Sequence, residues 1–211
     1  MIEALLKNKE VVERFYSKRN VVELVKYENE LYVLKRFQNL SLLEKEVEIL
    51  TLLDCEMCVP VVVDTFFDCL LLEYIDGELY LDRFMRYEEN DLDCDDLVKE
   101  MLIFLQLFYS RTKTPQGQRI VNDVNFRNYI FRNETIIGFD FEQAKFGEIE
   151  EDIGKIMSFA LMYSPENTPW KQRFAECFLR NSVELLQLDK EKIEYYALQE
   201  MNAIKERRKN K

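Results

Sequence analysis

The order of short apolar runs is the feature that most constrains the fold of this chain. Five runs rich in Val, Leu and aromatic residues predict strands. They lie at Val11–Phe15, Val21–Tyr27, Leu31–Phe37, Val61–Val63 and Leu70–Tyr74. The break between the second and third runs suits a hairpin turn, because Asn29 tolerates left-handed φ. Ser41 opens a predicted helix after the third run, with Glu44 as its capping-box partner. The first 75 residues therefore predict the order β-β-β-α-β-β.

The rest of the chain is predicted to be mainly helical. Apolar residues recur at helical spacing in four segments. These segments are Leu97–Tyr109, Ile153–Met162, Arg173–Leu188 and Glu191–Lys205. Between them, Tyr129–Phe131 and Thr135–Phe139 predict a hairpin that turns at Asn133-Glu134. The closing Lys205–Lys211 (KERRKNK) is predicted to be a frayed basic tail. An α+β protein follows, either as one domain or as two lobes that share a core.

The chain contains no histidine, and this absence limits the chemistry that it can perform. Ser-His-Asp and Cys-His nucleophile systems and histidine-ligated zinc are excluded. Catalysis must then use carboxylates, Lys, Tyr, Cys or a bound metal. The 29 basic and 40 acidic side chains give a net charge of −11. This charge argues against a nucleic-acid partner, because binding phosphates needs clustered Lys and Arg. No stretch reaches the ~18 apolar residues of a membrane span, so we expect no membrane partner and a cytoplasmic location.

Two further patterns have an ordinary structural interpretation as well as a functional one. Cys55 and Cys58 form a lone CxxC, which zinc or redox sites use, but no second pair or His accompanies it. We interpret it as chance placement in a loop. The acidic run at residues 88–96 could attract a cationic substrate. A solvated loop with helix-capping residues is the interpretation that we favour for that run.

The segment Asn122–Asn128 (NDVNFRN), followed by a hairpin and then Phe139–Glu142 (FDFE), carries the strongest chemical signal. Phosphoryl transfer needs a carboxylate to orient and deprotonate an alcohol. It also needs a second carboxylate and an amide oxygen to hold Mg²⁺ against the nucleotide phosphates. A D-x-x-x-x-N loop followed by D-F-x supplies all three oxygen groups from neighbouring segments.

At these residues the sequence resembles the protein-kinase-like superfamily, and most of all its aminoglycoside and choline phosphotransferases and their minimal relatives. The resemblance implies a bilobal fold. Residues 1–74 would form a nucleotide-binding lobe, with a small antiparallel sheet and one helix. Residues 75–211 would form a mainly helical lobe that carries the catalytic and metal loops.

The resemblance also implies roles for residues of the first lobe. The stretch Tyr32–Lys35 resembles the V-A-I-K strand, whose Lys binds the α- and β-phosphates of ATP. Residues 45–50 (KEVEIL) resemble the helix whose Glu pairs with that Lys, and Glu46 is the candidate over Glu44 and Glu48. Residues 70–77 resemble the hinge, where backbone groups of Glu73 and Tyr74 would hydrogen-bond the adenine.

In the second lobe, the resemblance implies that Asp123 is the catalytic base. Asn128 and Asp140 would hold the metal. The stretch at residues 147–154 (GEIEEDIG) resembles one that follows the metal loop in phosphotransferases. Its Asp152 would be structural and would support the catalytic loop.

The sequence departs from the family pattern at several positions. No glycine occurs before Gly77, so the usual glycine-rich phosphate loop is missing. Ser17 and Asn20, in the loop after the first strand, could donate to phosphates instead. Glu142 replaces the Gly of D-F-G. No activation segment ending in A-P-E is present.

Taken together, these residues predict an enzyme, a kinase that uses ATP and Mg²⁺ to phosphorylate an alcohol group. A small molecule is the expected acceptor. The alternatives are an atypical serine/threonine protein kinase, including a tRNA-modification-complex type that the basic tail favours weakly, and a nucleotide-binding pseudokinase or scaffold without turnover.

Overall fold

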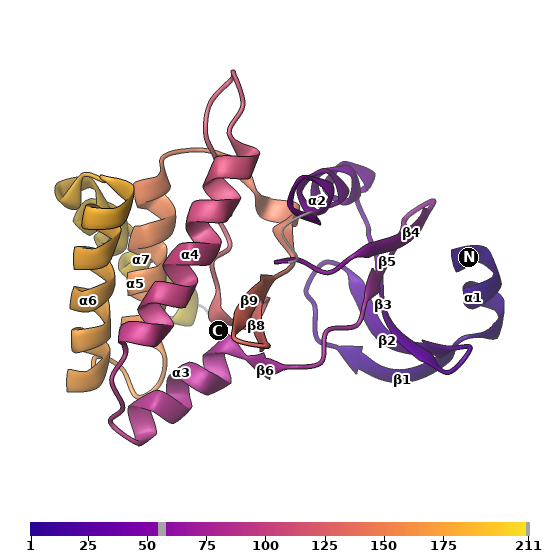
Figure 1. Ribbon diagram of the computed structural model, residues 1–211, viewed down its shortest axis with the longest axis horizontal. Coiled ribbons are helices and arrows are strands. Elements are labelled where there is room, and N and C mark those ends of the chain that lie inside the picture. Colours follow the sequence, from indigo (N-terminus) through magenta and orange to yellow (C-terminus); the bar gives the residue numbers. More distant parts are fainter. Residues whose placement is uncertain (55–57, 210–211) are drawn as a thin grey trace. The chain divides into compact units, whose positions relative to one another are not determined.

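The computed structural model describes residues 1–54 and 58–209, and its contacts divide the chain into two compact units (Figure 1). The first unit contains Met1–Gly77 and Ile137–Gln143, and the second contains Glu78–Ile136 and Ala144–Lys211. The predicted α+β fold, with an antiparallel sheet first and mainly helices after it, is confirmed. The first unit extends past residue 74, and it also includes a segment from late in the chain.

The first unit is built on an antiparallel sheet in the order β1-β2-β3-β5-β4. Its strands are β1 (Glu10–Phe15), β2 (Val21–Tyr27), β3 (Glu30–Arg36), β4 (Val62–Phe66) and β5 (Cys69–Glu73). The predicted hairpin joins β2 to β3, and its turn residues Glu28 and Asn29 have φ values of 50° and 68°. Lys35 of β3 pairs with Leu70 of β5. Because β3 has a bonded strand on each side, the backbone of Lys35 is firmly placed.

Among its described residues, the first unit contains two α-helices, α1 (Ile2–Asn8) and α2 (Leu40–Leu53), whereas the sequence predicted one. At seven residues, α1 is too short to show helical periodicity. It packs on the sheet through Ile2 and Leu5. The predicted start of α2 is wrong: Asn39 caps the helix by accepting a hydrogen bond from the Ser41 N–H at 3.0 Å. Ser41 therefore lies inside the first turn, and the Ser41–Glu44 capping box does not form.

The second unit consists of five helices, among the residues that the structure describes, and short strands. The helices are α3 (Tyr80–Glu89), α4 (Asp95–Thr112), α5 (Ile149–Met162), α6 (Pro169–Leu186) and α7 (Lys190–Lys209). The short strands are β6 (Glu78–Leu79), β7 (Arg119–Ile120), β8 (Tyr129–Arg132), β9 (Thr135–Gly138) and β10 (Lys145–Phe146). β8 and β9 form the predicted hairpin, which turns at Asn133 and Glu134 with φ values of 51° and 63°. The sequence did not predict α3.

Helices α6 and α7 pack against α5. A Cβ atom at Gly154 of α5 would lie 2.7 Å from the backbone nitrogen of Ala197 in α7, so only glycine allows this approach. Ser158 donates to the Ala197 carbonyl at 2.7 Å. The predicted frayed tail is wrong for residues 205–209, because α7 continues to Lys209. Arg208 binds Glu166 and the Met162 carbonyl, which docks the end of α7.

The acidic run is only partly a solvated loop. Glu88 lies in α3 and forms a 2.9 Å ion pair with Lys171, whose side chain is fully buried. Asp91 pairs with Arg173, and Asp95 begins α4. The Glu88 carboxylate stabilises helix packing, since a buried ammonium needs a paired acceptor. The favoured interpretation of the run is therefore wrong for Glu88, whereas Asp91 lies in an exposed turn, as that interpretation predicts. Cys55 of the CxxC lies outside the described residues, and Cys58 is buried.

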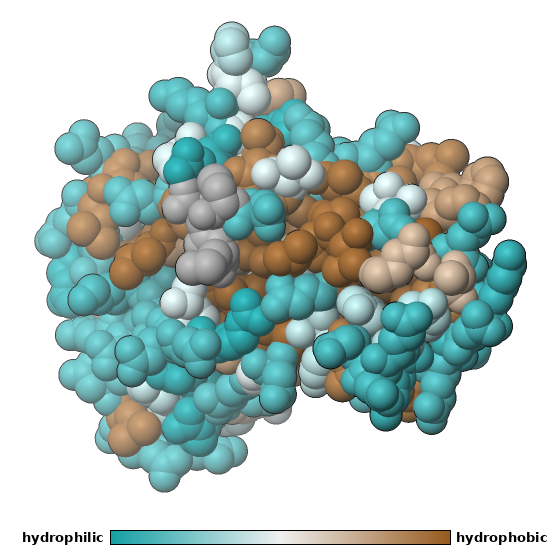
Figure 2. All heavy atoms as spheres, turned by 45° about the vertical axis from the view of Figure 1, so that its right-hand side comes forward, coloured by the Kyte–Doolittle hydropathy of each residue, from teal (hydrophilic) through white to brown (hydrophobic). Residues whose placement is uncertain are grey.

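The surface of the first unit exposes apolar as well as polar side chains. All six residues of the edge strand β1 are exposed. Figure 2 shows one face of the molecule, where brown hydrophobic atoms lie between teal hydrophilic ones. Within residues 1–54 and 58–209, no helix combines the length and apolar character needed to cross a membrane.

Candidate active site

A lysine surrounded by carboxylates lies in the first unit. The Lys35 ammonium is 2.6 Å from Glu46 Oε2, 2.5 Å from Asp140 Oδ1 and 3.3 Å from Glu142 Oε2. Strand β3 supplies Lys35, and the buried face of α2 supplies Glu46. The other two carboxylates come from the segment after β9. We call these four residues the lysine cluster.

Burial and charge act against each other in the lysine cluster. Burial disfavours the Lys35 ammonium, but Glu46 and Asp140 outweigh that effect and raise the pKa of Lys35 above its usual range. Burial raises the pKa of Glu46 to about 7, and Lys35 opposes this rise. The three carboxylates already neutralise the Lys35 ammonium. Lys35 therefore binds an anion such as a phosphate only weakly until a carboxylate moves away or a second cation binds to the carboxylates.

Glu142 contacts the loop between β1 and β2 as well as Lys35. It is buried, and its Oε2 accepts a hydrogen bond from Asn20 Nδ2 at 2.5 Å. Asn20 lies in the loop between β1 and β2, and its N–H donates to Ser17 Oγ at 3.2 Å. Arg19 of the same loop is 3.8 Å from Glu142. The residue that replaces the glycine of D-F-G therefore ties this glycine-free loop to Lys35. Nothing in the local sequence indicates this contact across 122 positions.

The proposed hinge residues follow the end of β5. The Glu73 N–H donates to the Val61 carbonyl at 3.0 Å, and Glu73 Oε2 accepts from the Val61 N–H at 3.3 Å. These bonds turn the Glu73 carboxylate back toward its own sheet. Glu73 and Tyr74 are both half-buried. Any contact with an adenine is therefore expected from backbone groups rather than from the Glu73 side chain.

The second unit carries the loop of residues 121–128, which we call the aspartate loop. Asn122 has a φ of 68°, and the Asp123 N–H donates to the Val121 carbonyl at 2.9 Å. Asn128 Nδ2 donates to the Asp123 carbonyl at 3.0 Å, which closes the loop. Within it, Phe126 is fully buried against Tyr80 and Phe84 of α3. The aspartate loop is therefore anchored at both ends and in its middle.

Tyr163 of the second unit adds a further anchor for the aspartate loop. Its hydroxyl accepts from the Phe126 N–H at 3.2 Å and donates to Asn125 Oδ1 at 3.1 Å. The same Asn125 oxygen accepts from the Arg127 N–H at 3.0 Å. These bonds satisfy the polar groups at the start of the short 3₁₀ helix Phe126–Asn128.

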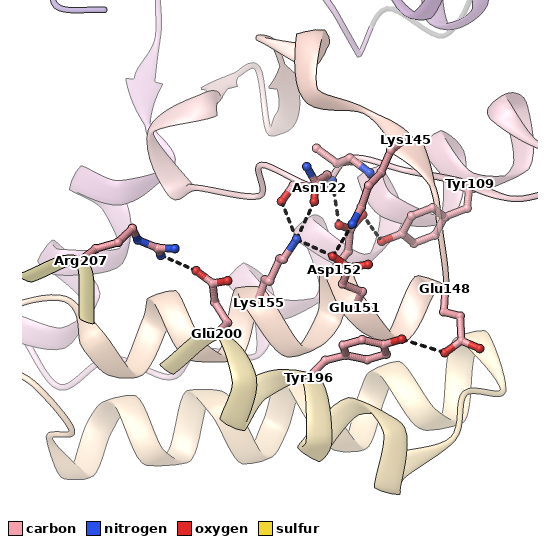
Figure 3. Close-up of polar contacts among 11 residues, drawn as sticks. Tyr109, Asn122, Lys145, Glu148, Glu151, Asp152, Lys155, Tyr196, Glu200 and Arg207 are labelled. Atoms are coloured by element: carbon pink, nitrogen blue, oxygen red, sulfur yellow. Dashed lines mark hydrogen bonds and ion pairs between the residues drawn. The ribbon is translucent and has the colours of Figure 1, made fainter. Parts of the chain in front are cut away.

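Asp152 of α5 holds the beginning of the aspartate loop, as Figure 3 shows. Its carboxylate accepts from the Val121 N–H at 2.7 Å, the Asn122 N–H at 2.8 Å and the Tyr109 hydroxyl at 3.1 Å. Asp152 is fully buried, and burial raises its pKa to about 6 although these donors favour the charged form. The geometry is that of a buried support for backbone amides.

Among the residues that the structure describes, two groups of side chains have ligand atoms close enough to hold a metal ion. The oxygens of Glu46, Asp140 and Glu142 lie within 4.8 Å of one another. Hard oxygen ligands of this kind suit Mg²⁺. In the second unit, Cys94, Asp95 and Cys177 meet the same distance limit. The Cys177 sulfur already accepts from Asn181 at 3.2 Å, and burial raises the pKa of Cys177 to about 12, which favours a packed thiol.

Comparison with known proteins supports the fold. No protein-family model matches the sequence, and no curated protein matches it. Among solved structures, aminoglycoside phosphotransferase APH(2'')-Ib with ADP bound matches with a TM-score of 0.58 and 15% identity. The match covers 87% of this chain and 83% of that one.

A kinase from the granulovirus of Cydia pomonella, PK-1, matches with a TM-score of 0.54 and 16% identity. The match covers 69% of this chain and 57% of the viral kinase, so the chain spans little more than half of that protein. The two matched structures are a kinase and a phosphotransferase. The chain has the protein-kinase-like fold.

Proposed function

We propose that this protein is an ATP- and Mg²⁺-dependent phosphotransferase that transfers the γ-phosphoryl group of ATP to an alcohol. The single observation that carries the proposal is the Lys35–Glu46 ion pair of 2.6 Å, with Asp140 2.5 Å from the same ammonium. In a protein-kinase-like fold, that Lys binds the α- and β-phosphates, the Glu orients the Lys, and the Asp binds metal.

In the proposed reaction, Asp123 accepts the proton of the acceptor hydroxyl. A bond forms between the acceptor oxygen and the γ-phosphorus, and the bond from that phosphorus to the bridging oxygen of ADP breaks. The support for Asp123 is the way its loop is built. The bonds of Asp152 and Asn128 to the backbone next to Asp123 restrict where its carboxylate can lie.

The residues assigned to Mg²⁺ have suitable donor chemistry. Asn128 uses its amide nitrogen for the Asp123 carbonyl, which turns its Oδ1 away from that bond and leaves a neutral oxygen donor. Asp140 adds a carboxylate that is 37% exposed. Bound Mg²⁺ would neutralise charge on the phosphates. Ser17 and Asn20 would line the phosphates, and backbone groups of Glu73 and Tyr74 would bind the adenine.

The decisive test is Asp123→Asn. Removing a positioned general base usually lowers the rate by roughly 10²–10⁴. We expect turnover, measured as Mg²⁺-dependent release of ADP from ATP with water as acceptor, to fall by that factor. Nucleotide binding, measured by calorimetry, should persist. Turnover equal to that of the wild type would remove Asp123 from the reaction.

A second candidate function, a nucleotide-binding pseudokinase, is favoured by the additional carboxylate on Lys35. Glu142 lies 3.3 Å from the ammonium, and the loop it holds contains no glycine. Binding of ATP without any release of ADP by the wild type would select this function.

If the enzyme is active, the class of acceptor can be tested by comparing turnover with a panel of small amino alcohols and sugars and turnover with a panel of Ser/Thr peptides.

A further inference from the structure

The residue immediately before Asp123 has an unusual backbone. Asn122 has a φ of 68°, and the groups on its two sides, the Val121 carbonyl and the Asp123 N–H, are bonded at 2.9 Å. A hydrogen bond between residues two apart, across a left-handed centre, defines the strained form of the γ-turn. Such a conformation persists only where the surrounding structure holds it in place. If this turn relaxes, the backbone at Asp123 changes direction, and the Asp123 carboxylate moves with it.

Asp152 restrains only one side of the turn. It accepts from the N–H groups of Val121 and Asn122, and therefore it cannot restrain the Asn122 carbonyl or side chain. Lys155, one turn later on α5, reaches both of those groups (Figure 3). Its ammonium donates to Asn122 Oδ1 at 2.6 Å and to the Asn122 carbonyl at 3.2 Å.

The third donor of Lys155 is also used. Glu151 Oε1 accepts it at 2.7 Å, so that the three protons of the ammonium meet three acceptors. The side chain of Lys155 is only 15% exposed, which makes these bonds stronger than those of a solvated lysine. An isolated Glu–Lys pair four residues apart on a helix contributes little. The two bonds to Asn122 distinguish Lys155 from such a pair.

We propose that Lys155 is a positioning residue for Asp123, acting through Asn122, and this inference rests on the proposed phosphotransferase function. Asp152 and Lys155 lie three residues apart and thus on one face of α5. Together they grip the amide, the carbonyl and the side chain of the same residue.

Lys145 provides a matched control. Its ammonium binds the same Glu151 Oε1 at 2.8 Å, and its side chain is 45% exposed. Lys155→Met and Lys145→Met each remove one cation from the same carboxylate, with nearly the same change in size. Only the first removes the bonds to Asn122.

The experiment combines turnover with hydrogen exchange. For Lys155→Met, we expect kcat for Mg²⁺-dependent ATP hydrolysis to fall by roughly 10- to 100-fold, because small misplacements of a reacting group have effects of that size. The KM for ATP should stay within about twofold of the wild type, since Lys155 lies outside the proposed nucleotide contacts. Lys155→Arg, which keeps a cation, should recover part of kcat. Lys145→Met should retain the wild-type kcat.

Hydrogen exchange of the amides in residues 121–128 tests the inference separately from activity. Exchange there should be faster in Lys155→Met than in the wild type and in Lys145→Met. If the wild type hydrolyses no ATP, the proposed function fails, and the exchange comparison still decides whether Lys155 holds the loop. Unchanged exchange in Lys155→Met, or an equal loss of kcat in both Met variants, would overturn the inference.

Discussion

The lysine cluster of the first unit and the aspartate loop of the second are held in place in opposite ways. In the lysine cluster, ionisable side chains hold one another: a single ammonium faces Glu46, Asp140 and Glu142. In the aspartate loop, side chains hold the backbone, as Asp152 does for two N–H groups. Ion pairs between side chains rearrange when another ion binds nearby. Hydrogen bonds to backbone groups instead fix the conformation of the loop. In the proposed function, this difference fits the cluster as the place where nucleotide and metal bind, and the loop as the part that positions the base.

The largest expected effect comes from removing the cation of the lysine cluster. Lys35→Met leaves three carboxylates together, two of them buried. Removing one partner of a buried ion pair costs about 3–5 kcal/mol, so we expect the free energy of unfolding in urea to fall by about that amount. ATP turnover should be lost as well.

Adding Glu46→Gln to Lys35→Met should restore part of the lost stability, because it removes one of the unpaired charges. The double-mutant cycle then measures the coupling between Lys35 and Glu46. Additive effects of the two substitutions would show that charge does not hold the lysine cluster together.

The aspartate loop has its own dependence on pH through Asp152. Burial raises the pKa of Asp152 to about 6, above its value in the unfolded chain. The stability that Asp152 contributes is therefore fully present below about pH 4 and is lost as the pH rises through about 6. Turnover should change in the opposite sense and fall below pH 6, because a protonated carboxyl grips the two amides less well.

Asp152→Asn separates these two effects. It should reduce the change of melting temperature between pH 4 and 7, of which the remainder belongs to Glu46, whose pKa burial raises to about 7. It should also remove the acid limb near pH 6 from the turnover profile, at a lower maximal rate. Measuring both profiles for the wild type and the variant checks the assignment. An acid limb that persists in Asp152→Asn would assign it to another group.

The sequence predicted the elements with long apolar patterns better than the contacts between them. The order of the elements along the first unit, both hairpins and five of the helices (α2, α4, α5, α6 and α7) followed from local periodicity. The sequence did not predict the ten-residue α3, because its apolar pattern is short and the helix ends in the acidic run. The spacing of Lys35, Glu46, Asp123 and Asp140 marked positions that the structure places in two groups. The contacts of Glu142 with Asn20 and of Lys155 with Asn122 join residues far apart in the chain, and no local pattern encodes them.

The smallest expected effect concerns α2, which carries Glu46 to Lys35. Asn39 caps this helix through the Ser41 N–H, and it also accepts from the Ser41 hydroxyl at 2.8 Å. Loss of such a cap costs about 1 kcal/mol, so Asn39→Ala should lower the free energy of unfolding by about that amount. Ser41→Ala keeps the cap and should lower the free energy of unfolding by less.

Because helix α2 carries Glu46, Asn39→Ala should also weaken the ion pair between Glu46 and Lys35 and reduce turnover modestly. The aspartate loop, with its backbone bonds in the other unit, should show unchanged hydrogen exchange. Faster exchange in residues 121–128 of Asn39→Ala would mean that the two groups are not held independently.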